Sequence, residues 1–220
     1  MDIVYRDDRV EIIRLKTGPL ATNTYILRDI NSLEGVVIDP GGDVDKIIDT
    51  IRATKTTITH IIATHGHFDH ILGVPGLLDY TDALFLLHED DGAIMEMSYE
   101  YCRFYDPGWN IPEIDEYMDD GDIVKTGDIE LKIIHTPGHT PGSVSILGQG
   151  YIFTGDTLFK GTIGSTDFPG GNWNKMVESI IRLMALPDDI IVLPGHGDTT
   201  SIGEERKNNP FVREILSYKV

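Results

Sequence analysis

Short apolar runs separated by turn residues dominate the chain, and they predict many strands with helices between them. β-Branched or alternating runs predict strands at residues 12–15, 24–27, 36–38, 58–64, 83–88, 129–135, 144–147, 151–154 and 190–193. Most of these runs are followed by glycine, proline or aspartate, which are typical of chain reversals.

Three segments carry the apolar spacing of a helix instead. Residues 44–51 place apolar side chains at i, i+3, i+4 and i+7, and Asp43 before them is expected to cap the helix. A second helix is expected over residues 72–80, interrupted near Pro75, and a third over residues 176–184. The elements do not follow a strict βαβ alternation. They therefore predict one α/β domain in which mixed sheets are covered by helices.

Length and composition agree with a single globular domain spanning residues 1–220, with 40% apolar and 25% charged residues. The longest apolar runs have four to five residues, as at 83–87, and a membrane-spanning helix needs about 20. The first residues lack the basic and apolar regions of a secretory signal peptide. The single cysteine, Cys102, excludes an internal disulfide and a cysteine-based zinc site. We expect a soluble cytoplasmic protein without membrane contact.

The charge balance narrows the range of partners. The chain has 18 basic and 36 acidic residues, a net charge of −18. Such a field promotes solubility and repels polyanions, so nucleic-acid binding is excluded as the main function. The glycines form neither a dinucleotide-binding nor a Walker motif. A small molecule is the expected partner, and the sequence leaves the oligomeric state open, with a homodimer among the alternatives.

Five of the eight histidines and two aspartates lie in four short segments, each at or just beyond the end of a predicted strand. These residues are His65, His67, Asp69, His70, His139, Asp156 and His196. Loops at one edge of a sheet can converge on a common site. Glycines beside the last three would let the backbone approach closely.

The spacing of the first segment suits metal binding. His65 and His67 are two residues apart, so in extended chain their side chains point the same way and can bind one ion. Asp69 and His70 lie in the next turn and can face a second ion. Imidazole and carboxylate are ligands of zinc, iron and manganese. Chance would produce this arrangement in roughly one such chain in a thousand. The isolated histidines His60, His88 and His135 are instead expected to be packing or hydrogen-bonding residues.

The same residues give the sequence its resemblance to a known family. His65–His70 followed by His139, Asp156 and His196 resembles the metallo-β-lactamase superfamily over nearly the whole chain. Residues 136–143 (Thr-Pro-Gly-His-Thr-Pro-Gly-Ser) and 153–159 (Phe-Thr-Gly-Asp-Thr-Leu-Phe) are similar to glyoxalase II (hydroxyacylglutathione hydrolase) and its short bacterial relatives. The resemblance implies a four-layer αβ/βα sandwich with metals at one edge of the paired sheets.

The resemblance also implies a ligand set and a reaction. His65, His67 and His139 would hold the first of two divalent metal ions, expected to be zinc, with iron or manganese as alternatives. Asp69, His70 and His196 would hold the second, and Asp156 would bridge the two. A hydroxide between the ions would attack the carbonyl of a small thioester or related ester. Asp69 would also be catalytic, orienting the hydroxide and relaying a proton.

Substrate contacts are less well defined. In the glyoxalase II and persulfide dioxygenase branches, a basic residue nine positions after the bridging aspartate anchors a glutathione carboxylate. Ser165 stands at that position here, with Lys160 as a nearby cation. The aromatic stretch 99–109 is either a helix packed against the sheets, a cover over the metals, or part of a subunit interface. We take Lys160, Ser165 and Tyr105 as candidate substrate-binding residues.

Other functions stay open at this point. A mononuclear iron persulfide dioxygenase has similar motifs and would consume oxygen. Hydrolysis of a lactone, β-lactam or phosphodiester would use the same metals. A non-catalytic metal-binding or scaffold protein is disfavoured, because a structural zinc site is normally closed by four ligands.

Overall fold

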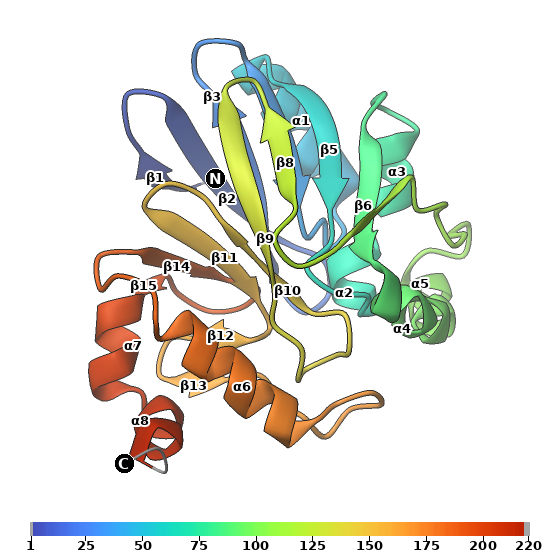
Figure 1. The fold of residues 1–220 in the computed structure, drawn as a ribbon. Coiled ribbons are helices and arrows are strands. Elements are labelled where there is room, and N and C mark those ends of the chain that lie inside the picture. Colours follow the sequence, from blue (N-terminus) through green and yellow to red (C-terminus); the bar gives the residue numbers. More distant parts are fainter. Residues whose placement is uncertain (1, 218–220) are drawn as a thin grey trace.

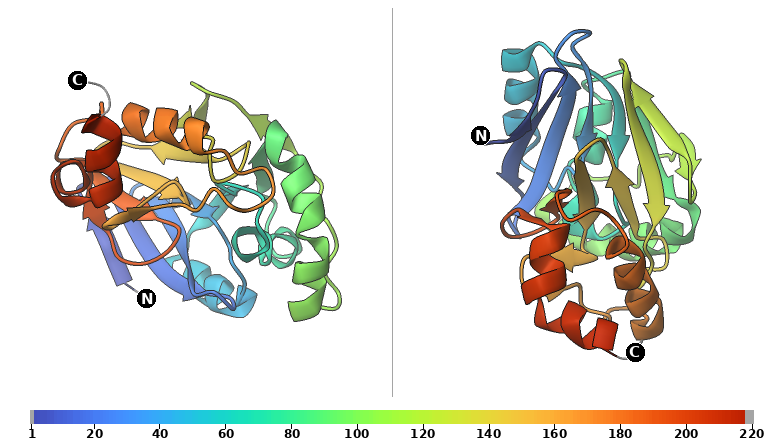
Figure 2. Two further views of the ribbon diagram at one scale, coloured as in Figure 1. Left: turned by 90° about the horizontal axis from the view of Figure 1, so that it is seen from below. Right: turned by 60° about the vertical axis from the view of Figure 1, so that its left-hand side comes forward.

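The computed structural model describes residues 2–217, which form two β-sheets packed face to face with helices on both outer sides (Figure 1; Figure 2, right). The first sheet contains, in spatial order, β1 (Asp2–Arg6), β2 (Val10–Thr17), β3 (Thr22–Asp29), β4 (Glu34–Ile38), β5 (Thr57–Ile62), β6 (Leu84–His88) and β7 (Glu116–Met118). Neighbouring strands are antiparallel from β1 to β4 and parallel from β4 to β7.

The second sheet contains, in spatial order, β15 (Thr200–Ser201), β14 (Ile191–Pro194), β11 (Tyr151–Gly155), β10 (Val144–Leu147), β9 (Ile129–His135) and β8 (Ile123–Thr126). Only its β11–β14 pair is parallel. A small hairpin of β12 (Leu158–Phe159) and β13 (Thr162–Ile163) follows β11.

Helices cover the outer face of each sheet. The first sheet is accompanied by α1 (Val44–Thr54), α2 (Phe68–Ile71), α3 (Val74–Leu78), the 3-10 turn η1 (Glu89–Asp91), α4 (Gly92–Met97) and α5 (Tyr99–Tyr105). The second is accompanied by α6 (Trp173–Leu183), α7 (Ile202–Asn208) and α8 (Pro210–Ser217). None of the described helices has the length and hydropathy needed to cross a bilayer.

Burial on both faces explains why the strands read as continuous apolar runs. In β4, Val36 and Ile38 point into the core between the sheets, whereas Val37 points into the core under the first set of helices. In β11, Phe153 belongs to the inter-sheet core and Ile152 to the core under α6, α7 and α8. Successive side chains of a strand point to opposite faces, so a strand with both faces covered must be apolar throughout. The predicted single-domain αβ/βα sandwich is confirmed.

Local expectations differ from the structure in three places. Asp43 precedes α1 with a φ of 48°, and its carboxylate accepts a hydrogen bond from the amide of Gly18 rather than capping the helix. The helix expected over residues 72–80 is present only as the shorter α3, which has Pro75 in its first turn, and the separate helix α2 ends before it at Ile71. Proline has no N–H to donate and is tolerated at that position. The strand expected to end at Thr64 ends at Ile62.

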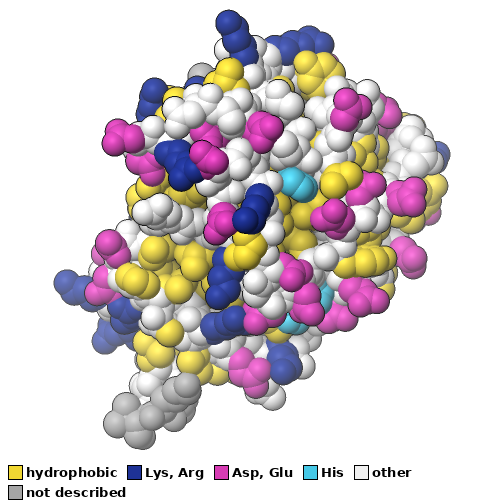
Figure 3. Space-filling model, turned by 45° about the horizontal axis from the view of Figure 1, so that its top comes forward, with side chains coloured by type: hydrophobic (Ala, Val, Ile, Leu, Met, Phe, Trp, Pro, Cys, Tyr) yellow, Lys and Arg dark blue, Asp and Glu magenta, His cyan; other side chains and the backbone are white. Residues whose placement is uncertain are grey.

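Charged side chains are spread rather than gathered. On the face shown in Figure 3, acidic and basic side chains are interspersed with apolar ones. On this face the excess of negative charge is therefore not gathered into one acidic patch.

Candidate metal centre

Four loops at the carboxyl ends of strands bring the predicted ligands together. His65 follows β5, His139 follows β9, Asp156 directly follows β11, and His196 follows β14. Their histidine and carboxylate groups meet within one cluster. The fold therefore produces the expected convergence, because the loops leave the carboxyl ends of β5 in the first sheet and of β9, β11 and β14 in the facing sheet.

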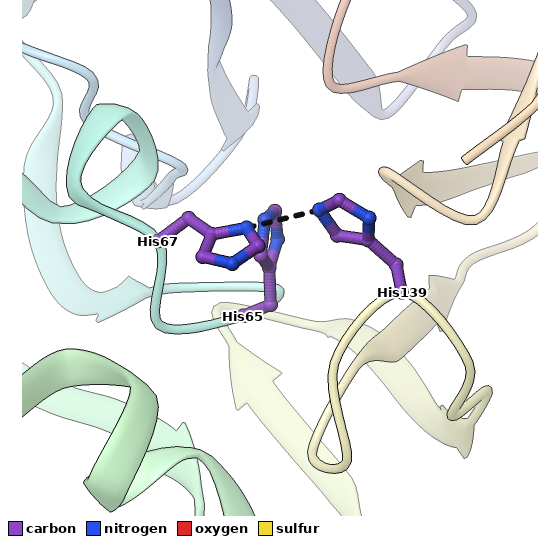
Figure 4. Close-up of side chains that lie close together, drawn as sticks. All are labelled: His65, His67 and His139. Atoms are coloured by element: carbon purple, nitrogen blue, oxygen red, sulfur yellow. Dashed lines mark hydrogen bonds between the residues drawn. The ribbon is translucent and has the colours of Figure 1, made fainter. Parts of the chain in front are cut away.

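Three histidines form the first part of the cluster. The side chains of His65, His67 and His139 point toward one another from two loops (Figure 4), and one ring nitrogen of each lies within 4.8 Å of the others. Nδ1 of His67 is 2.9 Å from Nε2 of His139. The rings meet nearly edge to face, at 80–84°. In this arrangement the in-plane lone pairs of different rings can converge on a single point.

Hydrogen bonds fix which ring nitrogens face the cluster. Nδ1 of His139 is 2.8 Å from the carbonyl oxygen of Ser165, to which it donates, so Nε2 carries the lone pair. The hydroxyl of Thr64 donates to Asp39 Oδ2 and lies 3.2 Å from Nδ1 of His65, from which it accepts. Nε2 of His65 is then a buried acceptor with no hydrogen-bond partner in the protein.

Asp69, His70 and His196 form the second part. Oδ2 of Asp69 is 3.1 Å from His196 Nε2 and 3.5 Å from His70 Nε2, and it accepts a hydrogen bond of 3.0 Å from the Thr22 hydroxyl. Nδ1 of His70 is 3.0 Å from Asp39 Oδ2. This contact leaves His70 Nε2 facing the other ligands.

Asp156 lies between the two parts. One carboxylate oxygen is 3.4 Å from His70 Nε2, and the other is 3.7 Å from His139 Nε2 and 3.5 Å from His196 Nε2. Gly195 permits this approach, because a Cβ at that position would lie 2.3 Å from Asp156 Oδ1. The carboxylate thus touches histidines of both groups, as expected of a residue that bridges two ions.

Burial and mutual charge shift the pKa values of these groups in different directions. Burial, reinforced by the neighbouring histidines, lowers the pKa of His65 well below its usual range and lowers that of His67 to about 4. Burial alone would raise the pKa of Asp69 and Asp156, but the adjacent His70 and His196 lower both. Burial opposes protonation of His70, yet Asp69, Asp39 and Asp156 raise its pKa well above normal. Unprotonated His65 and His67 and ionised carboxylates are the forms that bind metal.

Two buried aspartates that sequence reasoning did not single out organise this cluster. Asp39 accepts hydrogen bonds from the amide and hydroxyl of Thr64 and contacts His70. Asp91 is fully buried and accepts from the Gly66 amide (2.7 Å), the Thr140 hydroxyl (2.8 Å) and the Gly142 amide (2.6 Å). Asp91 therefore ties the loop of His65 and His67 to the loop of His139. The turn after β4 marks Asp39 in the sequence, whereas Asp91 is hidden in a run of three acidic residues.

The candidate substrate residues are placed less centrally. Lys160 is exposed, with Nζ 3.9 Å from Asp198 Oδ2. Ser165 contributes its carbonyl to His139, and its hydroxyl lies 3.4 Å from Asp167 Oδ2. Tyr105 stacks on Phe68 at 5.8 Å and is half exposed. The substrate roles of these three residues stay predictions.

A cavity of about 390 Å³ opens beside the cluster. Its lining combines five of the predicted ligands with apolar side chains and consists of Leu20, His67, Phe68, Asp69, Ile94, Met97, Ser98, Tyr101, His139, Asp156, Phe168, Pro169 and His196. Tyr101, rather than Tyr105, is the aromatic residue of α5 in this wall. Tyr101, Phe104 and Tyr105 are all exposed, so the alternative in which α5 packs its aromatic residues on the sheet is wrong for these three.

The donor set fits a metal centre. His65 has a buried Nε2 without a hydrogen-bond partner, the imidazoles of His70 and His139 are oriented through Nδ1, and the carboxylates of Asp69 and Asp156 are ionised, so their lone pairs are directed at a centre that a metal ion would satisfy. Imidazole and carboxylate donors suit zinc, iron or manganese. The arrangement can therefore hold divalent metal next to an open cavity.

Comparisons with known proteins agree with this geometry. The sequence profile described as "Metallo-beta-lactamase superfamily" matches residues 17–196. The "Hydroxyacylglutathione hydrolase GloC" of Haemophilus influenzae is 35% identical over 186 residues, covering 80% of this chain and 86% of its own length.

Two solved structures are similar throughout. The crystal structure of the BLEG-1 B3 metallo-beta-lactamase superposes with a TM-score of 0.84 at 33% identity, covering 91% of this chain and 99% of the other. The crystal structure of TTHA1623 in a di-iron-bound form has a TM-score of 0.79 at 31% identity, covering 90% and 99%.

Proposed function

This chain belongs to the metallo-β-lactamase superfamily, and on that premise we propose that it is a hydrolase that uses two divalent metal ions to cleave a small thioester or related ester. Zinc is the proposed metal, with iron or manganese as alternatives. Ions bound in this way supply Lewis acidity, which activates water and polarises a carbonyl group near neutral pH.

One observation carries the proposal: the ligand atoms fall into three overlapping groups that share residues. His65 belongs both to the group with His67 and His139 and to a group with His70 and Asp156. His70 belongs to that second group and to a third, with Asp69 and His196. Groups that overlap in this way support two adjacent ion positions rather than one closed structural site.

The residues around these positions have distinct tasks. Ser165 and Asp39 orient the rings of His139 and His70 through their Nδ1 atoms, so that the Nε2 atoms face the centre. Asp69 has a lowered pKa, and Thr22 fixes its Oδ2 atom at the edge of the cavity. Because the lowered pKa keeps it ionised, that oxygen can accept a hydrogen bond from a water molecule and orient it, and the proton relay through Asp69 stays a prediction.

The thioester assignment draws on the relative from Haemophilus influenzae, whose name gives a hydroxyacylglutathione hydrolase activity. The likeness to a protein named as a metallo-beta-lactamase makes a β-lactam the second bond to test. Both substrates present a carbonyl carbon to the same nucleophile, so neither requires a different arrangement of residues.

Metal analysis joined to a substrate panel tests the proposal. Protein purified without added metal should carry about two metal ions per chain and hydrolyse thioesters faster than lactones, β-lactams or phosphodiesters. Replacing His67 by alanine should remove both metal and activity, whereas the matched change of His60, which hydrogen-bonds to Thr59 and belongs to none of the donor groups among the described residues, should leave both. One iron ion per chain with oxygen consumption would instead indicate a persulfide dioxygenase and overturn the proposal.

A further inference from the structure

The cavity beside the metal centre has two sides of opposite chemistry. The predicted ligands form one side, and Leu20, Phe68, Ile94, Met97, Tyr101 and Phe168 form most of the other. These apolar residues come from four separate segments of the chain. They gather where a substrate bound at the ligands must place its remaining atoms.

The apolar wall is open to solvent. The exposed fractions are 52% for Leu20, 51% for Met97, 62% for Tyr101 and 54% for Phe168. Covering such side chains with an apolar group removes hydrocarbon surface from water and is favourable. A group that fills the cavity can therefore gain affinity from every methylene it contributes.

The wall offers no cationic side chain to a carboxylate. Among residues 2–217, no lysine or arginine lines the cavity, and Asp69 and Asp156 face it from the ligand side. Lys160, the cation closest in sequence to Asp156, lies beside Asp198 and outside the lining. A carboxylate held against this wall would lose hydration without gaining a cationic partner.

We propose that the cavity binds an uncharged alkyl or aryl group of the substrate, and that glutathione is not the preferred thiol carrier. This inference rests on the proposed function for the reaction, but it concerns a binding preference that can be measured without turnover. Tyr101 and Phe168 are the specificity-determining residues in it.

A homologous series of ligands tests the binding preference directly. Straight-chain carboxylates from acetate to hexanoate are titrated calorimetrically into the metal-loaded protein, so that the common carboxylate meets the metals and only the chain varies. The dissociation constant should fall about fourfold per added methylene until the cavity is filled. S-methylglutathione should bind more weakly than hexanoate. A dissociation constant that does not change with chain length, or tighter binding of S-methylglutathione than of hexanoate, would overturn the inference.

Two lysine variants of α5 provide a matched pair. Tyr101→Lys places a cation in the wall. It should reduce the gain in affinity per methylene and improve S-methylglutathione binding several-fold. Phe104→Lys changes an aromatic residue on the same helix that is 79% exposed and outside the lining, so it should change neither. Equal behaviour of the two variants would contradict the role of Tyr101. Because both positions are exposed, both variants are expected to fold, which circular dichroism verifies.

Turnover then separates the two proposals. Hexanoyl thioesters of a neutral thiol should be cleaved at least as efficiently as those of glutathione. A strong preference for glutathione thioesters would agree with the hydrolase proposal but contradict the inference about the cavity. If no thioester is cleaved, the proposed reaction is wrong, and the calorimetric titrations of the carboxylate series still show what the cavity binds.

Discussion

Within residues 2–217, histidine and aspartate side chains gather in two regions, which differ in where their ring nitrogens point. At the metal centre, the rings of His65, His67 and His139 meet edge to face. In the second group, His88 and His135 lie nearly parallel, with ring centres 4.2 Å apart and planes at 19°, beside Asp90. The ligand atoms of both groups fall within 4.8 Å of one another.

The lone pairs of two stacked rings lie in nearly parallel planes about one ring spacing apart, so they cannot converge on one ion between the rings. Nδ1 of His88 accepts a hydrogen bond from the Asp90 amide, so the proton of the neutral ring is on Nε2. Nε2 of His135 contacts the carbonyl oxygen of Pro141 at 2.8 Å. The second group is thus a stacked pair that joins β6 to β9. The comparison teaches that proximity of donors is insufficient and that ring direction distinguishes a metal centre from packing.

The largest expected difference in activity and metal content is between Asp156→Ala and His88→Ala. Asp156 touches histidines of both parts of the centre, so its loss should lower activity by more than roughly 100-fold, the upper range for residues that only support a ligand. His88→Ala should keep metal content and activity near the wild-type values. Metal analysis and steady-state kinetics on both purified variants check this, and equal losses would break the distinction between the two groups.

Asp91→Asn should have the next largest effect. An amide cannot accept all three hydrogen bonds that the carboxylate of Asp91 accepts from Gly66, Thr140 and Gly142. The loops of the first three histidines should then loosen, lowering metal affinity roughly 10-fold to 100-fold. Competition with a chelator measures this, and the neighbouring Asp90→Asn is the control. Unchanged affinity would show that the loops hold their geometry without Asp91.

The stacked pair should contribute to stability alone. Removing one ring of an aromatic stack costs about 0.5–1.5 kcal/mol beyond the lost burial. His135→Ala should therefore lower the free energy of unfolding by about 1–2 kcal/mol in urea denaturation of the metal-loaded protein. If metal content fell together with stability, His135 would be shown to support the metal centre, which would contradict the prediction.

The smallest expected effect is a pH dependence of stability. Burial, followed by the charge of His135, lowers the pKa of folded His88 from 6.5, while Asp90, Asp119 and Asp91 oppose the shift. Below pH 6.5 the unfolded chain binds a proton at this residue that the folded protein resists, so stability falls as the pH drops. His88→Gln should lose less stability than the wild type between about pH 6.5 and 5. Parallel urea titrations across this range measure the difference, and identical slopes would contradict the shift.

Much of the fold follows from local pattern. The buried strands of both sheets were predicted from their apolar runs, because a strand covered on both sides leaves a strong signal. The short strands β7 and β8 and the exposed edge strand β1 were not predicted, since few of their residues are buried. Helices α7 and α8 were also missed, although Val212 and Ile215 are buried at helical spacing.

The sequence by itself determined which donors are present, how they are spaced and that each group lies at or just beyond a strand end. Only the tertiary structure decided which nitrogen of His139 faces the centre, since that depends on the carbonyl of Ser165 in another loop. It likewise placed the buried Asp91 between two loops and brought Leu20, Phe68 and Phe168 into one wall. Side-chain direction and shared walls arise from packing between distant segments, which no local pattern encodes.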